Sequence, residues 1–276
     1  MGDVVADPLA LFDASFGVPH LEAWMWVVTG GMMVTWLLLG AIFRAVGPFK
    51  QEALFVAHKV IVICYSAVLF KFGIEAWLFQ PTLATGEERM FHLVPGGMLV
   101  NQLMATAMIW DTVATCAVPS MRKPDLVAHH FVVLAVCFTA MYLEAGTYFL
   151  SFFYGITEVS SIPLCVVNLF SKERVTLQPL LENKIWATVN AICRVLFALS
   201  FIAVRCFWWF PIMVEVEAAL FTSHMNKILA GVIGIAGVAL TALQWYWASK
   251  VVNQVRKALS KKDNAGKGAP LLANEV

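Results

Sequence analysis

Long apolar segments dominate this chain, and most of it is built from stretches that could cross a membrane as helices. The hydrocarbon core of a bilayer is about 30 Å thick, so a spanning helix needs about 20 mostly apolar residues. Seven segments meet this requirement, namely residues 23–43, a segment from 53 onward, 97–118, 126–143, 146–170, 185–210 and 228–249. Since backbone groups in lipid must be hydrogen-bonded internally, these segments are helices rather than open strands.

The composition agrees with a membrane protein, because 60% of the residues are hydrophobic and only 13% are charged. A soluble domain carries about twice that share of charge. The sequence therefore predicts an all-α polytopic membrane protein, whose seven transmembrane helices form a bundle. Lys71 and Glu75 leave the far end of the second helix undefined, although two residues four apart on a helix can pair.

Charged residues divide unequally between the two sides of the predicted bundle. If the amino terminus is outside, the outer segments hold nine carboxylates against the two bases Arg89 and Lys227, and thirteen bases fall in the inner segments. Basic loops stay in the cytosol. The amino terminus is therefore predicted to be extracytosolic and the carboxyl terminus cytosolic.

Four regions follow from this topology. We expect an extracytosolic segment over residues 1–22, a first anchor and loop over 23–52, a six-helix membrane domain over 53–250 and a basic flexible cytosolic tail over 251–276. The aromatic run 207–210 resembles the belt that closes a span at the membrane surface. Arg205, next to that run, is expected to snorkel toward the outer interface.

Polar side chains from different predicted helices lie at similar depths in the half of the bundle assigned to the cytosol. Ionisable residues inside a membrane are costly, so each one indicates a functional site. At a rise of 1.5 Å per residue, these side chains all lie roughly 6 to 18 Å from the cytosolic end. They predict a cytosol-facing cavity lined by His58, Asp111, His129, His130, Glu158, Asn190 and Arg194.

The adjacent pair His129 and His130 is the most specific part of this set. Neighbouring residues on a helix point about 100° apart, which disfavours joint coordination of one metal ion, and no metal site is predicted. One imidazole is expected to face the cavity as a proton acceptor, while the other is held by a neighbour such as Asp111. Asp125, four residues before His129, could orient it or could serve only in capping the helix.

The fifth predicted helix contains the segment Tyr-Gly-Ile-Thr-Glu-Val-Ser-Ser-Ile-Pro, residues 154–163. Gly155 and Pro163 predict a bend whose freed carbonyls are satisfied by nearby hydroxyl groups. Glu158 in this segment and Arg194 at matching depth form the obvious candidate ion pair. Such a pair can be part of a site or can be purely architectural.

These residues resemble the TLC superfamily, named for homology among TRAM, Lag and CLN proteins. The resemblance covers residues 58–249 and depends most on residues 125–130 and on Glu-Val-Ser-Ser-Ile-Pro, with Asn190 and Arg194 also matching. It implies a helical bundle around a lipid-accessible cavity. Ceramide synthases of this superfamily transfer an acyl group from acyl-CoA, but Val133 stands where they carry a threonine, and Glu158 is the single acid near their paired aspartates. The chain is thus more similar to the TLC-domain-containing branch, whose members are linked to membrane lipid composition.

Three functions remain open at this point. The first is binding or handling of lipid in membrane lipid homeostasis, with His58, Glu158, Asn190 and Arg194 as ligand-binding residues. The second is an acyl-CoA-dependent acyltransferase that uses His129, His130 and Asp111 in catalysis. The third is a structural membrane subunit of a larger complex.

Partners and location are expectations of the same kind. A membrane lipid is the expected partner, no cofactor is expected, and acyl-CoA enters only as the substrate of an acyltransferase. No nucleic-acid-binding patch occurs in the short loops. A homo-oligomer or a place in a complex is a further expectation, and the resemblance indicates the endoplasmic reticulum first and the plasma membrane second.

Overall fold

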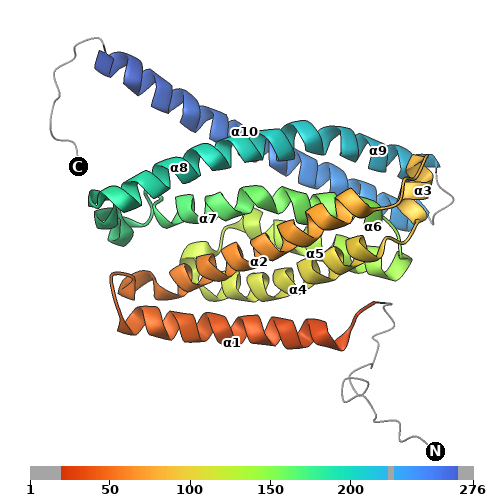
Figure 1. Cartoon of the computed structure of the whole chain (residues 1–276), viewed down its shortest axis with the longest axis horizontal. Helices are drawn as coiled ribbons and strands as arrows, with labels where there is room; N and C mark the ends of the chain where they lie inside the picture. The colour runs from red at the N-terminus through yellow and green to blue at the C-terminus, as the bar shows by residue number, and fades with distance from the viewer. Residues whose placement is uncertain (1–19, 223–226, 267–276) are drawn as a thin grey trace, which may run out of the picture.

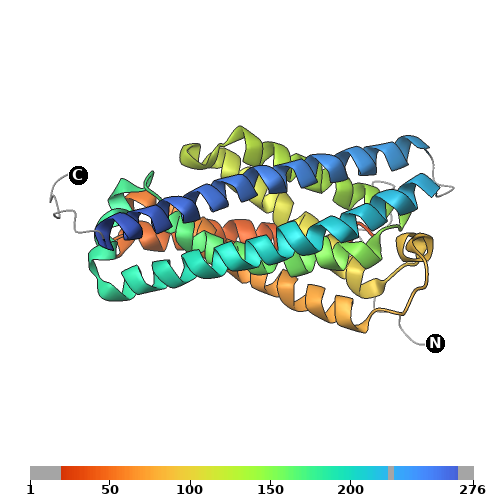
Figure 2. The same ribbon diagram turned by 90° about the horizontal axis from the view of Figure 1, so that it is seen from above.

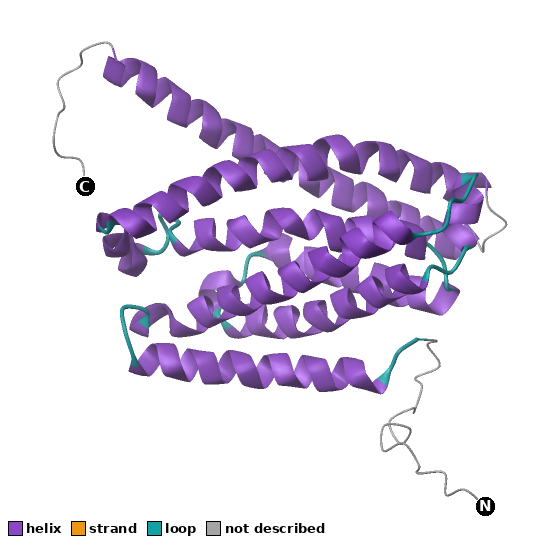
Figure 3. Cartoon of the chain, in the orientation of Figure 1, coloured by secondary structure: helices purple, strands orange, loops and turns teal. Residues whose placement is uncertain are grey.

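The computed structural model describes residues 20–222 and 227–266, and these residues form an elongated bundle of helices (Figure 1). No strand occurs within the described ranges, and short loops join the helices at the two ends of the bundle (Figure 3). The prediction of an all-α fold is confirmed. Most of the predicted extracytosolic segment, residues 1–19, lies outside the described residues.

The long helices pack side by side along the bundle axis, and a few 3-10 and π segments interrupt or connect them. The α-helices are α1 (Ala23–Ala45), α2 (Ala53–Phe79), α3 (Gly86–Phe91), α4 (Pro95–Ala117), α5 (Pro124–Leu143), α6 (Thr147–Leu150), α7 (Ser161–Leu169), α8 (Lys184–Ser200), α9 (Trp209–Thr222) and α10 (Lys227–Gly266). The irregular helical segments are η2 (Lys50–Glu52), η3 (Pro119–Met121), η4 (Ser151–Gly155), η5 (Ile156–Ser160), η6 (Val175–Glu182) and η7 (Phe201–Trp208).

Six helical stretches of the described chain are long and apolar enough to cross a membrane, and α4 is not among them. The predicted number of seven spans is therefore not confirmed. α4 nevertheless has 23 residues, of which 14 are buried. Its buried residues include Asn101, Gln102 and Asp111, and these polar side chains lower the mean hydropathy of the helix. They are tolerated because neighbouring helices shield α4 from lipid.

The sixth predicted helix is much longer than expected. Helices α8, η7 and α9 form one stretch from Lys184 to Thr222, so the prediction that this span ends near residue 210 is wrong. The aromatic run lies in the middle of the stretch, where Trp209 is 5% exposed and its Nε1 donates a hydrogen bond to Thr241 Oγ1 at 3.0 Å. Trp209 is thus part of the packing, whereas Phe207, Trp208 and Phe210 are exposed on the surface of the bundle. Arg205 lies about 25 Å from the outer end of the helix at 1.5 Å per residue.

The fifth predicted helix is broken where the sequence indicates a bend. The π segment η4 ends at Gly155 and is followed by the 3-10 segment η5, and regular α-helix returns at Ser161. As predicted, hydroxyl groups satisfy carbonyls along the break, because Thr157 Oγ1 donates to the Phe153 carbonyl at 2.6 Å and Ser160 Oγ to the Thr157 carbonyl at 2.9 Å. Irregular turns of this kind re-aim side chains and occur often at functional sites.

Close backbone contacts hold α2 against this break. A Cβ atom built on Gly73 would meet the backbone of Gly155, and one built on Gly155 would meet that of Gly73. Two glycines at the crossing let the helices approach more closely than side chains allow. On the exposed face of α2, Lys71 Nζ lies 3.0 Å from Glu75 Oε2, as the spacing predicts.

α10 forms one wall of the bundle. Viewed from above, it lies between α5 on one side and α8 to α9 on the other (Figure 2). It does not end near residue 249 as predicted but continues as a helix to Gly266, beyond the rest of the bundle (Figure 1). The first sixteen residues of the predicted flexible tail, 251–266, are therefore helical, whereas residues 267–276 lie outside the described chain.

Candidate functional site: a polar chamber joined to an apolar pocket

Asp111 of α4 is the centre of a buried polar cluster. Its carboxylate accepts hydrogen bonds from His58 Nε2 at 2.6 Å and Tyr65 Oη at 3.1 Å, both from α2, and from Thr115 Oγ1 at 3.1 Å, one turn along α4. Asp111 is only 6% exposed. A carboxylate this deep in an apolar bundle is stable because several donors replace its hydration.

The hydrogen bond to Asp111 fixes the state of the His58 ring. A carboxylate only accepts hydrogen bonds, so the hydrogen lies on His58 Nε2, and Nδ1 has a free lone pair when the ring is neutral. Nδ1 is buried and has no hydrogen-bond partner among the described residues. The ring stacks on Trp110, with centroids 5.1 Å apart and planes 18° apart, which holds its orientation.

The two neighbouring histidines of α5 point in different directions, as the 100° helical rotation predicts. His130 Nε2 lies 3.8 Å from Asp111 Oδ2, close enough for electrostatic interaction but too far for a hydrogen bond. His129 packs edge-on against Trp247 of α10, at a centroid distance of 5.5 Å. His130 is therefore the imidazole of the pair that lies next to Asp111, without a hydrogen bond to it.

Glu158 of η5 forms a buried ion pair with Arg205 of η7. Arg205 Nη2 lies 3.0 Å from Glu158 Oε1, and Ser66 of α2 donates to the other carboxylate oxygen at 3.0 Å. The guanidinium group also donates to the hydroxyl groups of Ser160, at 2.8 Å, and Ser161, at 3.2 Å. Both charges are carried by irregular helical segments, which turn them toward each other across the bundle.

The predicted pairing of Glu158 with Arg194 is therefore wrong. Arg194 Nε donates to Asn190 Oδ1 at 3.2 Å, one turn away on α8, and its Nη2 donates to the Phe170 carbonyl at 3.5 Å. The error follows from the misplaced end of the sixth helix, which made Arg205 seem close to the membrane surface. Counting residues placed Arg194 level with Glu158, but the guanidinium group that reaches Glu158 is that of Arg205, eleven residues further along the helix.

These groups surround a polar cavity of about 180 Å³, which we call the chamber. Five of the seven predicted residues line it, namely His58, Asp111, His129, His130 and Glu158, together with Arg205, Lys59, Tyr65 and Trp247. Asn190 and Arg194 do not line it. The chamber lies toward the end of the bundle where α2 and α5 begin, because His58 is five residues and His129 five residues from those helix starts.

The charges around the chamber nearly balance. Asp111 and Glu158 supply two carboxylates, and Arg205 and Lys59 supply two cations. Lys59 has no carboxylate within 4.0 Å in the part of the chain that the structure describes, whereas Arg205 is paired. The three imidazoles can add positive charge but not negative charge, so the chamber favours a neutral or anionic group over a cation.

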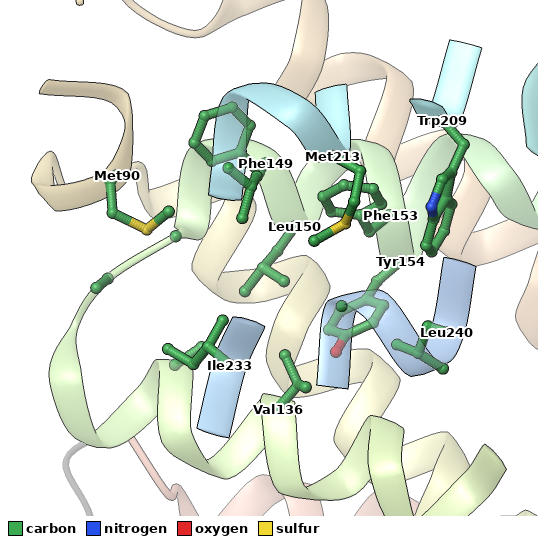
Figure 4. A pocket seen from close by; sticks show the side chains of 15 residues that line it. Met90, Val136, Phe149, Leu150, Phe153, Tyr154, Trp209, Met213, Ile233 and Leu240 are labelled. Carbon is green, nitrogen blue, oxygen red and sulfur yellow. The ribbon is translucent and has the colours of Figure 1, made fainter. Parts of the chain in front are cut away.

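A second cavity, which we call the apolar pocket, lies toward the opposite end of the bundle. It has a volume of about 70 Å³, and its walls come from α3, α5, α6, η4, α9 and α10. Figure 4 shows the aromatic and aliphatic side chains that face it, with Phe149, Phe153 and Trp209 around the space and Leu240 closing it from α10. Such a surface suits hydrocarbon.

A small third cavity of about 40 Å³, the joint, shares walls with both of the others. Phe153, Tyr154, Trp209 and Leu240 line both the joint and the apolar pocket, and Met108, His129, Glu158 and Arg205 line both the joint and the chamber. The three cavities therefore lie in a row. On α5, for example, Ala140 faces the apolar pocket, Val133 the joint and Leu126 the chamber.

No cluster of three or more His, Cys, Asp or Glu side chains suited to a metal ion occurs among the residues that the structure describes. His129 and His130 have ring centroids 6.0 Å apart at an angle of 57°. The cavity row is thus lined by hydrogen-bonding groups and hydrocarbon.

Sequence reasoning missed several polar residues of these cavities, among them Arg205, Tyr65, Gln244 and Asn168. Arg205 was assigned to the membrane surface, and Tyr65 and Gln244 were not singled out, although Gln244 is 2% exposed and lines the joint. The signal for Gln244 was present, since an amide in the middle of an apolar span is costly unless it has a partner inside the bundle. Tyr65 carried no such signal, because an aromatic residue is ordinary in a span.

Comparison with known proteins adds one finding. A family model for the TLC domain (TRAM/LAG1/CLN8) matches residues 53–253, from the first residue of α2 into α10. The match contains every residue of the chamber, the joint and the apolar pocket, and leaves α1 outside. A search of curated proteins gave no match.

Proposed function

Since the chain belongs to the TLC domain family, we propose that it binds a membrane lipid, with the polar part of the lipid in the chamber and a hydrocarbon chain in the apolar pocket. The observation that carries this proposal is the row of three cavities, polar at one end and apolar at the other. An amphiphile has the same division along its length. Handling of such a lipid would contribute to membrane lipid homeostasis.

The sizes of the cavities favour a lipid with one chain in the bundle. The joint, at about 40 Å³, has room for one small polar group or for a single chain passing through. Lys59, which lines the chamber and has no carboxylate within 4.0 Å among the described residues, suits a phosphate or a carboxylate, and the unpartnered Nδ1 of His58 suits a hydroxyl group.

Blocking the apolar pocket tests this proposal. Ala140 of α5 is 5% exposed and lines the pocket, so Ala140→Trp fills it, whereas Ala135→Trp places the same side chain on the exposed side of the same helix. Both full-length variants are purified in detergent, and lipids that co-purify are identified by mass spectrometry. We expect Ala140→Trp to lose most of the lipid that the wild type and Ala135→Trp retain.

The readout separates binding from folding, because the helical content and melting temperature of each variant are measured in parallel. Equal retention of lipid by a folded Ala140→Trp would contradict the proposed chain site. Absence of any specific lipid from the wild type would contradict the function as a whole and would favour a structural subunit.

Acyl transfer is a second candidate function, and the buried His58–Asp111–His130 group favours it. In such a reaction an imidazole accepts the proton of an attacking hydroxyl or amine, a new bond forms to the thioester carbonyl of acyl-CoA, and the thiolate leaves and is protonated. His130 has a buried Nδ1 without a partner among the described residues and a carboxylate 3.8 Å from Nε2. Against this function, Glu158, the acid near the expected aspartates, is already neutralised by Arg205.

Turnover of acyl-CoA by the purified protein decides between these two functions. If the protein is an acyltransferase, the double variant His129→Ala, His130→Ala loses turnover and Asn190→Ala, outside the chamber, retains it. Lipid bound without turnover in the wild type would support binding alone.

We further propose that the amino terminus is extracytosolic, the carboxyl terminus cytosolic and the membrane that of the endoplasmic reticulum. The bias of basic residues supports this orientation, and it makes the chamber the cytosolic end of the cavity row. Single cysteines introduced at Glu87 and at Gln254, in a chain whose native cysteines are replaced, would react with impermeant reagents from opposite sides. Labelling of Glu87→Cys from the cytosol would reverse the orientation.

A further inference from the structure

Gln244 of α10 is a buried amide that no interaction within the described bundle explains. It is 2% exposed, and its Oε1 has no hydrogen-bond partner among the described residues. A buried carbonyl oxygen without a donor costs about 1–3 kcal/mol. The described helices supply no donor for this oxygen, so a donor can reach it from the cavity that Gln244 lines.

That cavity is the joint, and its composition makes Gln244 conspicuous. Met104, Met108, Val133 and Leu240 supply apolar walls. The Tyr154 hydroxyl donates to the Val133 carbonyl at 3.5 Å, and Glu158 and Arg205 bind each other. Gln244 and His129, whose Nδ1 is also buried without a partner in the described chain, are the polar groups left for a ligand.

The position of Gln244 along α10 defines which part of a ligand it would meet. Gly237 and Leu240 line the apolar pocket, Gln244 lines the joint and Trp247 lines the chamber. The spacing of three, four and three residues places all four on one face of the helix. A lipid lying along this face has its chain beside Leu240 and its polar head beside Trp247, so Gln244 lies beside the point where chain and head meet.

We infer that Gln244 is a specificity-determining residue, whose Oε1 accepts a hydrogen bond from a hydroxyl or N–H group at the junction between the head and the single chain of the bound lipid. This inference rests on the proposed function. It narrows the ligand class to single-chain amphiphiles that carry a hydrogen-bond donor at that junction, and it disfavours lipids that have only acceptors there.

Two matched probes test the inference with the full-length protein. 1-O-hexadecylglycerol and 1-O-hexadecyl-1,3-propanediol have the same chain and terminal hydroxyl, but only the first has a hydroxyl on the middle carbon. Both are offered at equal concentration, and the bound ratio is read by native mass spectrometry. One hydrogen bond is worth about tenfold in affinity, so we expect the wild type to prefer the glycerol probe by about that factor.

Variants assign the preference to Gln244. Gln244→Met keeps the length of the side chain and removes the amide, so the preference falls to within about twofold because neither probe then meets an amide oxygen at that position. Gln254→Met makes the same change at an exposed position of α10 and retains the preference. Gln244→Asn keeps a shorter amide and gives an intermediate ratio, which tests the inference even if Gln244→Met does not fold.

The outcomes separate this inference from the function on which it rests. Binding of both probes without preference in the wild type, or a preference unchanged in Gln244→Met, overturns the role of Gln244 and leaves lipid binding intact. Binding of neither probe, together with no lipid retained during purification, overturns both. A preference that only Gln244 variants lose supports the inference.

Discussion

The chamber and the apolar pocket lie on the same helices but are built in different ways. The chamber is held by hydrogen bonds and ion pairs between segments distant in sequence, such as Glu158 with Ser66 and Arg205. The apolar pocket is held mainly by packing, with Phe149 and Phe153 of one helix facing Met213 of another (Figure 4), and hydrogen bonds such as that from Trp209 to Thr241 lie at its edge. One end therefore depends on a few directional contacts, and the other on many weak ones.

This difference predicts how each end responds to substitution. A buried ion pair fails when one partner is removed, because the other charge is left without compensation in an apolar surrounding. An apolar wall tolerates changes of shape that conserve volume. A single substitution that removes one partner of an ion pair in the chamber should thus cost more stability than a single volume-conserving substitution in the apolar pocket.

Arg205→Met, at the chamber, has the largest expected effect on stability. It leaves Glu158, which is 9% exposed, without its cation, and we expect a loss of about 3–5 kcal/mol in the free energy of unfolding. The double variant Arg205→Met, Glu158→Gln removes both charges and should recover part of that loss. Thermal and denaturant unfolding of the purified protein in detergent measure both.

The exposed pair on α2 is the matched control for this charge removal. Lys71 is 62% exposed in its side chain, and Lys71→Met removes a cation from an ion pair of similar length. Since exposed pairs contribute little, we expect a change within about 0.5 kcal/mol. If Arg205→Met costs no more than Lys71→Met, the chamber is not held by its charges and the contrast with the pocket disappears.

The sequence predicted the chamber better than the pocket for a physical reason. Ionisable residues in apolar spans are rare and costly, so His58, Asp111, His130 and Glu158 could be recognised one by one. Apolar side chains that line a pocket look the same in sequence as those that face lipid. Nothing in the letters distinguishes Val136, which lines the pocket, from the exposed Phe131 on the same helix.

Partner assignments were less predictable than the residues themselves. Arg205 replaced Arg194 as the partner of Glu158 because the continuous helix from Lys184 to Thr222 passes through a π segment, which changes the side from which its residues project. Pro211 follows this segment closely and cannot donate a backbone hydrogen bond to the preceding turn. Arg205 lies eleven residues, or about 16 Å, further along this helix than Arg194, so the depth counted from the sequence failed together with the direction.

Gly155→Ala has the next largest expected effect and acts between the two ends. The added Cβ would meet the backbone of Gly73 and lie 3.2 Å from the Leu69 carbonyl oxygen, and backbone atoms cannot yield as side chains do. We expect a loss of about 1–3 kcal/mol, typical of overpacking, together with weaker lipid retention because Tyr154 and Glu158 flank this position.

Gly231→Ala on α10 is the control for this glycine. A Cβ there meets nothing within 4 Å, so the substitution should be neutral or should stabilise the helix by up to about 1 kcal/mol. Opposite signs of the two melting-temperature shifts would show that the α2 contact requires glycine. A neutral Gly155→Ala would mean that the break in the fifth helix can move without disturbing either cavity.

Tyr65→Phe is the smallest change and tests whether the chamber works as a network. It removes one of the hydrogen bonds to Asp111 and keeps the ring, which packs on Trp110 at a centroid distance of 6.0 Å. Because His58 and Thr115 still donate to the carboxylate, the expected loss is about 1 kcal/mol. Tyr246→Phe, on the exposed face of α10, removes a hydroxyl without such a role and should change stability by less than about 0.5 kcal/mol.

The free energies of unfolding of Tyr65→Phe, Thr115→Val and their double variant then form a double-mutant cycle. A double loss larger than the sum of the single losses indicates that the donors share the charge of Asp111, whereas simple additivity would mean that each bond acts alone and that this end resembles the apolar pocket after all.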